Sequence, residues 1–213
     1  MTFRPDERGE FLSRARGAPA ALGLDEDIPH DAGLASVVNR VRRGIFVSEG
    51  VFDSLYPPGV VRLSRRHWTP IAVARRAVEM LVVDASTRVL DVGAGVGKLC
   101  LVGALTTGAT FTGIEQRAPL VGLARAVAQR YGVTRATYLH GVIGDVDWSQ
   151  YDAFYFFNPF GENRLEPAEW IDAEVELGRS RYERDLGVAL AALERARAGT
   201  RVVTYHGLGA ELA

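Results

Sequence analysis

The chain has 213 residues, of which 47% are apolar, 24% are charged and 9% are aromatic, and this composition excludes a disordered, collagen-like or disulfide-stapled protein. Its 25 lysines and arginines nearly balance its 26 aspartates and glutamates, so no global field attracts nucleic acid or anionic lipid. With a single cysteine, no secretory leader pattern and no apolar run long enough to span a bilayer, we expect a soluble, cytoplasmic protein without a membrane partner.

The first 66 residues differ from the rest because prolines and charges interrupt any long periodic pattern. The best-patterned piece is 34–41, where the apolar positions 34, 37, 38 and 41 share one helical face. We therefore predict an N-terminal helical appendage over 1–66 and a second domain over 67–213. Between residues 40 and 66, six arginines stand against two acidic residues, which indicates either a solvated edge or a phosphate-facing patch.

From Trp68 onward the pattern becomes regular. Thr69 and Pro70 are typical of a helix start, and apolar residues from Ile71 to Leu81 follow on one stripe. Strands and helices then alternate, which predicts right-handed crossovers and a doubly wound, mainly parallel α/β sheet. The predicted elements are a helix to about 83, a strand at 88–93, a helix at 97–106, a strand at 110–115, a helix at 118–131, strands at 136–141 and 151–158, a helix at about 173–198 and a strand at 201–206.

A glycine-rich turn joins the first predicted strand to its helix, where a doubly wound sheet binds its ligand. Residues 91–97 read Asp-Val-Gly-Ala-Gly-Val-Gly. A P-loop requires glycine at position 92 and Ser or Thr at position 99, where this chain has Val92 and Leu99. A dinucleotide turn requires its third glycine at position 98, and a pyrophosphate would be repelled by Asp91. A nicotinamide site and a purely structural turn remain as alternatives.

The turn resembles motif I of the class I S-adenosylmethionine-dependent methyltransferases, which bind a ligand carrying an ammonium and a sulfonium. The resemblance implies that S-adenosylmethionine is the cofactor and that Asp91 favours its positive charge. Glycine lets a ligand approach backbone that a Cβ would block. The turn residues expected to contact the cofactor are Gly93, Ala94, Gly95 and Gly97.

Later strand ends supply further candidates for binding this cofactor. Glu115 ends the second strand about 20 residues past the turn, where a carboxylate accepts both ribose hydroxyls, and Gln116 flanks the adenosine. The resemblance also implies an acidic residue after the third strand that reads the adenine amino group, but Val142 occupies its usual position. Either Asp145 takes that role from a longer loop, or the adenine edge meets the backbone of Val142 and Ile143.

The exit of the fourth strand carries the candidate chemistry, because residues 158–161 read Asn-Pro-Phe-Gly. Alone, this sequence is a turn signal. It resembles the Asn-Pro-Pro-aromatic motif of methyltransferases that act on planar amino groups, shortened by one proline, and more loosely the Asn-aromatic segment of Dot1-type histone-lysine methyltransferases. The resemblance implies that Asn158 accepts from the target amino group, that Pro159 removes a competing donor and that the Phe160 ring stacks on the substrate.

The segment before the first regular helix has two interpretations. Trp68 and Thr69 either help to close the cofactor site at its methionine end, as the resemblance implies, or act as an apolar staple and an N-cap. The four histidines stand far apart without HExxH or Cys-His spacing, so we expect no metal site.

The resemblance covers residues 68–207. In the resembled family, the core continues after the fifth strand into a sixth and a seventh strand. The chain leaves too little room for both after the fifth strand, so either the edge strands are absent, or the sequence is truncated, or the N-terminal region covers that edge of the sheet. An exposed edge strand is a pairing liability, and we expect the appendage or a second subunit of a homodimer to cover it.

Together, these patterns predict an S-adenosylmethionine-dependent methyltransferase that acts on a nitrogen, in RNA or protein rather than in a small molecule. Two alternatives stay open at this point: a non-catalytic S-adenosylmethionine-binding module and an NAD-dependent oxidoreductase.

Overall fold

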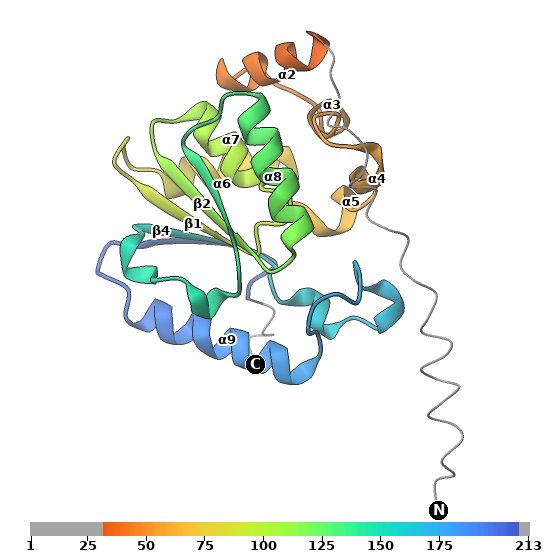
Figure 1. Ribbon diagram of the computed structural model, residues 1–213. Helices are drawn as coiled ribbons and strands as arrows, with labels where there is room; N and C mark the ends of the chain where they lie inside the picture. Colours follow the sequence, from red (N-terminus) through yellow and green to blue (C-terminus); the bar gives the residue numbers. More distant parts are fainter. Residues whose placement is uncertain (1–31, 209–213) are drawn as a thin grey trace, which may run out of the picture.

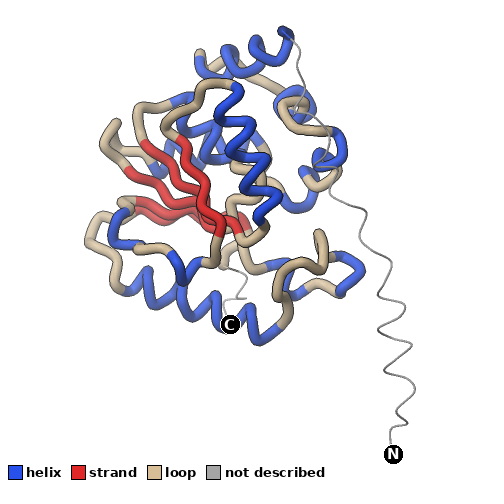
Figure 2. The backbone as a smooth tube through the Cα atoms, viewed as in Figure 1, coloured by secondary structure: helices blue, strands red, loops and turns tan. Residues whose placement is uncertain are grey.

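A computed structural model describes residues 32–208, which form a five-stranded sheet with helices on both faces (Figures 1 and 2). All neighbouring strands pair in parallel in the order β3-β2-β1-β4-β5, which confirms the predicted doubly wound α/β fold. The strands are β1 (Arg88–Val92), β2 (Thr110–Glu115), β3 (Ala136–His140), β4 (Ala153–Phe157) and β5 (Arg201–Tyr205).

The two faces of the sheet bury alternate side chains of the same strands, as a pleated sheet requires. Val89, Phe111 and Tyr155 belong to the core on one face, which is covered by α6 (Ile71–Leu81), α7 (Lys98–Thr106) and α8 (Ala118–Arg130). Leu90 and Phe154 belong to the core on the other face, which is covered by α9 (Arg179–Glu194). The strand order reverses between β1 and β4, so the carboxyl ends of these two strands mark the place where a ligand crevice forms.

The described part of the appendage consists of short helices that pack beside α6 and α7 (Figure 1). Its buried side chains, Val38 and Phe52 among them, share one hydrophobic core with the helices on that face of the sheet. Lys98, the first residue of α7, is fully buried and forms ion pairs with Glu49 and Asp53 of the appendage. The appendage helices are α2 (Ala32–Arg42), α3 (Glu49–Asp53), α4 (Pro58–Val61) and α5 (Ser64–His67).

The largest difference from the predicted elements lies between β4 and α9. The helix expected from about 173 begins at Arg179, because Gly178 adopts a φ of 117° that no helix continues through. Residues 161–178 instead form an irregular segment with two 3₁₀ turns, η3 (Gly161–Arg164) and η4 (Pro167–Glu169), which we call the strap.

Strand β5 is the edge of the sheet, and within the described residues nothing pairs with its outer side. Val202 is 44% exposed and Tyr205 is 39% exposed, so the described part of the appendage does not supply the cover expected from the sequence. A second subunit as cover stays a prediction, and residues 1–31 and 209–213 lie outside the described part of the chain.

Candidate functional site

The glycine turn adopts a backbone conformation that only glycine supports without strain. Gly93, Gly95 and Gly97 have φ values of 74°, 55° and 76°. A Cβ on Gly93 would lie 3.0 Å from the Cβ of Pro159, and a Cβ on Gly97 would lie 2.1 Å from the Tyr138 ring. At Gly95, by contrast, a Cβ would meet nothing within 4 Å. The turn therefore packs tightly on both sides and leaves open space at its middle glycine.

That open space belongs to a cleft at the carboxyl ends of the strands. The cleft has a free volume of about 1090 Å³, which includes its solvent-filled mouth. Residues from both the appendage and the sheet line it, so the two parts of the chain meet at this site. The residues predicted for the cofactor or for catalysis that line it are Gly93, Gly95, Glu115, Gln116, Val142, Ile143, Asn158, Pro159 and Phe160.

Glu115 is fixed in the wall of the cleft by two backbone donors. Gly95 N donates to its Oε2 at 3.0 Å, and Arg117 N donates to its Oε1 at 2.9 Å. Burial raises the pKa of this carboxyl, while the two N–H donors and the Arg117 charge oppose that rise. The carboxylate is thus held in one orientation with lone pairs left for a ligand's hydroxyl groups.

Asp91 lies below the glycine turn rather than in the main cleft. It is 4% exposed, and the Cys100 thiol lies 3.6 Å from its Oδ2. Burial raises the pKa of this carboxyl to about 7, with the nearby Glu115 charge adding to the rise. Asp91 and Thr69 line a small cavity that shares His67 with the cleft wall. The small cavity therefore lies beside the cleft, with Gly93 in the wall of both.

Asn158 directly follows β4 and has an unusual backbone conformation. Its φ is 46°, and its backbone N donates to Tyr205 O at 3.2 Å while its O accepts from Gly161 N at 3.0 Å. Its side chain is exposed in the cleft and has no hydrogen-bond partner among residues 32–208. The next residue, Pro159, packs against Gly93 of the glycine turn. Pro159 therefore lies beside the turn predicted to hold the cofactor, while the Asn158 amide lies in the cleft against Gly161, where a Cβ would be 2.1 Å from its Nδ2.

Phe160 lies mostly below the surface of the cleft. It is 2% exposed and packs in the core with Phe156 and Ile143. Only a small part of the ring reaches the cleft wall, so the stacking on a substrate plane expected from the sequence has little ring area to act through.

The loop after β3 carries both candidates for contacting the adenine edge. Asp145 Oδ2 accepts from Val142 N at 2.9 Å, and its side chain is not part of the cleft wall. Val142 and Ile143 are part of that wall. The Asp145 carboxylate therefore shapes the loop, and residues 142 and 143 face the cleft. Gln116 lies across from this loop, and its carbonyl lies 3.1 Å from the His140 Nε2.

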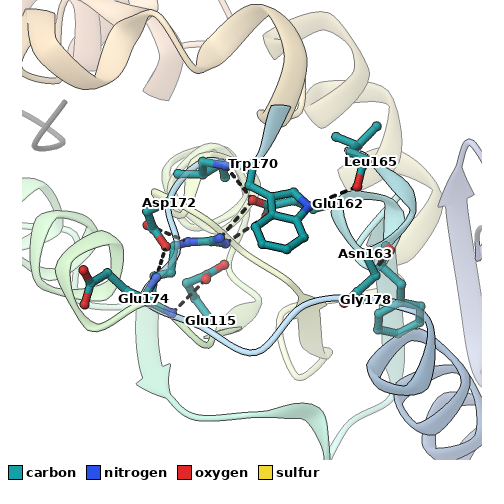
Figure 3. A network of polar contacts seen from close by, with 11 residues as sticks. Glu115, Glu162, Asn163, Leu165, Trp170, Asp172, Glu174 and Gly178 are labelled. Atoms are coloured by element: carbon teal, nitrogen blue, oxygen red, sulfur yellow. Dashed lines mark hydrogen bonds and ion pairs between the residues drawn. The ribbon is translucent and has the colours of Figure 1, made fainter. Parts of the chain in front are cut away.

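Arg117 was not among the predicted site residues, yet it joins Glu162 and Asp172, two members of the network of polar contacts in Figure 3. The buried guanidinium forms a bidentate pair with Glu162 at 2.9 and 3.0 Å, and its Nε donates to Asp172 at 2.8 Å. Glu162 also accepts from Ile171 N at 2.6 Å. These contacts fold the strap against the end of β2. The six acidic residues between 162 and 176 were the only signal of this role.

Arg66 and His67 are the second feature that the sequence analysis missed. Both line the cleft from the appendage, and Arg66 Nη2 lies 2.5 Å from Glu169 Oε1 of the strap. This ion pair connects the two sides of the cleft. Burial, together with the charges of Arg66 and Arg117, lowers the pKa of His67 to about 4, so its imidazole is neutral at physiological pH.

Two searches of the described residues bear on other kinds of site. Among residues 32–208, no group of three or more His, Cys, Asp and Glu side chains could hold a metal ion. In the same span, no helix is long and apolar enough to cross a membrane.

Comparisons with known proteins place these features in a family. The model of the family described as protein-L-isoaspartate(D-aspartate) O-methyltransferase matches residues 25–159. Among solved structures, an RNA methyltransferase from Salinibacter ruber in complex with S-adenosyl-L-homocysteine is 26% identical, with 64% of this chain and 75% of that chain covered and a TM-score of 0.48. The C-terminal domain of precorrin-6Y C5,15-methyltransferase from Rhodobacter capsulatus is 17% identical, with coverages of 65% and 64% and a TM-score of 0.45. No curated protein matches the chain in sequence.

Proposed function

The chain belongs to the protein-L-isoaspartate(D-aspartate) O-methyltransferase family and is an S-adenosylmethionine-dependent methyltransferase, and we propose that the cleft between Gly93 and Asn158 holds both the cofactor and the methyl acceptor. The family assignment supports the reaction class. The site residues and the acceptor are argued from the geometry of the cleft.

The residues present fit the chemistry of this cofactor. The space beside Gly95 and the two backbone-held oxygens of Glu115 suit a ribose with two hydroxyl groups. We place the amino-acid end on the side of the cleft next to Asp91 and Thr69, because a buried carboxylate is a counter-charge for an ammonium. The backbone at Val142 and Ile143, together with Gln116, borders the space left for the adenine.

Bound S-adenosylmethionine supplies a methyl group on a sulfonium, with a good leaving group already built in. The protein's contribution is therefore to position the acceptor and to exclude water. Arg117 and Glu162 hold the strap as one wall of the cleft, and Pro159 fixes Asn158 beside the glycine turn. No described residue needs to act as a nucleophile in this arrangement.

The acceptor we propose is a nitrogen, in RNA or protein. The free amide of Asn158 carries this proposal, because its carbonyl oxygen can accept from an N–H of the acceptor and so orient the nitrogen lone pair. The left-handed backbone of Asn158 supports the same conclusion. Strained conformations of non-glycine residues concentrate at functional sites.

A second candidate is a carboxylate oxygen, which the description of the matched family favours. The Asn158 amide can also donate a hydrogen bond, and Arg66 on the opposite wall supplies a positive charge. A carboxylate acceptor would therefore find a donor and a counter-ion in the same cleft.

Labelling with tritiated S-adenosylmethionine separates the two candidates. We would offer the protein an isoaspartyl peptide, total RNA and a cell protein extract, and then treat each labelled product with mild base. A methyl ester is hydrolysed and releases volatile methanol, whereas an N-methyl group stays on the substrate. Base-stable label on RNA or protein that is recovered as an N-methylated nucleoside or amino acid after complete hydrolysis supports the nitrogen acceptor, and volatile label from the peptide supports the carboxylate.

The role of Asn158 is tested in the same assay. We expect Asn158→Ala to lose turnover by about 10²-fold or more while its affinity for S-adenosylhomocysteine stays within about 2-fold of the parent, since misplacing an acceptor costs rate rather than cofactor binding. Asn39→Ala is the matched control, because Asn39 is exposed on α2 and lies outside the cleft wall. Unchanged turnover in Asn158→Ala would contradict the proposed role.

A further inference from the structure

An exposed aromatic side chain stands on the loop between α2 and α3, at the top of the molecule in Figure 1. Phe46 is 70% exposed and its neighbour Ile45 is 39% exposed, while Val47 on the same loop is buried in the core. Arg40 Nη2 donates to Phe46 O at 2.8 Å, and Arg75 Nη2 donates to Gly44 O at 2.8 Å. The ring is thus presented to solvent by a loop that is anchored from both sides.

The charged side chains on and beside this loop are arginines, and within residues 32–208 no carboxylate pairs with them. Arg40, Arg42, Arg43 and Arg75 form no ion pair with any carboxylate of residues 32–208, and Arg40 and Arg75 contact only carbonyl oxygens of the loop. The acidic residues closest along the chain are already engaged. Glu49 pairs with Lys98, and Glu79 pairs with Arg76. We call Phe46 and these four arginines the Phe46 surface.

We propose that the Phe46 surface binds single-stranded nucleic acid, with a base stacked on Phe46 and phosphates on the surrounding arginines. A π face beside a cluster of guanidinium groups is the combination that single strands require, because stacking needs an unpaired base and the backbone needs positive charge. Arginine also matches phosphate geometry with two parallel donors. The apolar part is one ring with a partly exposed isoleucine, which is little area to insert into a lipid surface.

The position of the surface connects it to the cleft. His67 lines the cleft, and the eight steps along the chain from His67 to Arg75 can span no more than about 20 Å, since the last four lie within α6. A strand held at Phe46 can therefore reach the acceptor site. This link rests on the proposed RNA acceptor, whereas the binding surface itself does not.

Fluorescence anisotropy with a labelled single-stranded RNA of about 12 nucleotides tests the inference, with the full chain, in the presence of S-adenosylhomocysteine and over a range of salt. We expect Phe46→Ala to weaken binding by about 5- to 100-fold without changing the salt slope, because it removes stacking and no charge. We expect Arg42→Gln with Arg43→Gln to reduce the slope of log K against log salt by about 1.4, since each lost phosphate contact on a single strand removes about 0.7.

Arg195→Gln is the matched control, because Arg195 is exposed on the far helix and has no carboxylate partner among the described residues. This substitution removes the same charge as a single arginine substitution in the Phe46 surface. The RNA affinity and the slope of log K against log salt should equal those of the parent within error. All of these positions are exposed, so equal melting temperatures show that the variants are folded.

The inference is overturned if the parent protein does not bind RNA, or if Phe46→Ala and the double arginine variant bind RNA with the parent's affinity and salt slope. It is also overturned if the protein binds vesicles of anionic lipid but not RNA, and Phe46→Ala abolishes the vesicle binding. Binding and methyl transfer are measured separately. RNA binding through Phe46 without any methylation of RNA would defeat the proposed acceptor alone. Methylation of RNA by Phe46→Ala and the double variant at the parent's rate and affinity would defeat the Phe46 surface alone.

Discussion

Arg117 and Glu162 face each other with two parallel hydrogen bonds of 2.9 and 3.0 Å, although Arg117 directly precedes α8 and Glu162 lies 45 residues later on the strap. Arg117 is also the residue whose backbone N–H orients Glu115. One residue therefore supports the wall of the cleft with its side chain and the predicted ribose-binding carboxylate with its backbone. A buried bidentate pair of this kind is costly to break from one side.

Replacing Arg117 by methionine should destabilise the protein by about 3–5 kcal/mol, because the Glu162 and Asp172 carboxylates would remain buried without a counter-charge. Urea unfolding measures the loss. Amide hydrogen exchange should show that residues of the strap lose protection before the sheet does. Arg179→Met is the control, since Arg179 is 91% exposed in its pair with Glu183 and should cost less than about 1 kcal/mol. A loss below about 1 kcal/mol at Arg117 would contradict this account.

Glu115 should govern both cofactor affinity and stability, because in Glu115→Gln the amide NH2 faces one of the two backbone N–H donors and leaves it without an acceptor. Glu115→Gln keeps the shape of the side chain but removes its charge and one hydrogen-bond acceptor. We expect about 10- to 100-fold weaker binding of S-adenosylhomocysteine, because hydrogen bonds to a charged group are lost. Calorimetry measures this change in affinity. Glu79→Gln, on the exposed face of α6, is the matched variant and should bind as the parent does. If both variants bind equally well, Glu115 is not a cofactor ligand.

Three glycine-to-alanine variants should separate steric from conformational demands. Gly97→Ala places a Cβ 2.1 Å from the Tyr138 ring at a φ of 76°, so we expect a loss of several kcal/mol or a failure to fold. Gly95→Ala has open space at a φ of 55° and should cost only about 1–2 kcal/mol of stability, while its methyl group enters the cleft and weakens cofactor binding.

Gly122→Ala is the internal control for this series, because Gly122 lies within α8 with nothing within 4 Å of its Cβ. Thermal unfolding should show a gain of about 0.4–1 kcal/mol, since alanine loses less backbone entropy in a helix. Equal effects at positions 95 and 97 would mean that packing against Tyr138 is not what fixes the turn.

Patterns of local spacing predicted most of the fold. The five strands and the helices between them follow from alternation of apolar runs and turn signals, and Gly93, Glu115 and Asn158 fall in one cleft because parallel strands end at the same edge. Contacts between distant segments left no such local pattern. Arg117 and Arg66 appear in the sequence as ordinary charged residues, and their partners lie 45 and 103 residues away.

Local spacing could not predict the helix start at Arg179 or the burial of Phe160, for a similar reason. Acidic residues of the strap are compatible with a helix, but the contacts of Glu162 and Asp172 with Arg117, together with the φ of 117° at Gly178, hold the segment in another conformation. The aromatic residue at 160 fits a stacking motif in sequence, yet the core below the cleft has space for its ring. Tertiary packing decided both cases.

The pH dependence of Asp91 should link stability and cofactor binding in opposite directions. Burial raises its pKa from 3.8 to about 7, so the folded state binds the proton more tightly than the unfolded state does. Its contribution to stability is therefore greatest below pH 3.8, declines as the pH rises to about 7 and is lost above that value. Asp91→Asn removes the buried charge, and at pH 8 we expect chemical unfolding to show a gain of roughly 2–4 kcal/mol.

The same substitution should weaken cofactor binding, because a neutral amide offers no counter-charge to the ammonium of S-adenosylhomocysteine. For the parent protein, calorimetry should show affinity falling as the pH drops below about 7, where Asp91 takes up a proton, while Asp91→Asn should bind weakly at every pH. Asp147→Asn is the matched control, since this carboxylate is exposed and its pKa is lowered by hydrogen bonds from Ser149 and Gln150. A variant at Asp91 that is less stable at pH 8 and binds the ligand as the parent does would show that this carboxylate only supports the turn. If Asp91→Asn gains stability and loses affinity for S-adenosylhomocysteine, the buried Asp91 charge destabilises the fold and serves ligand binding.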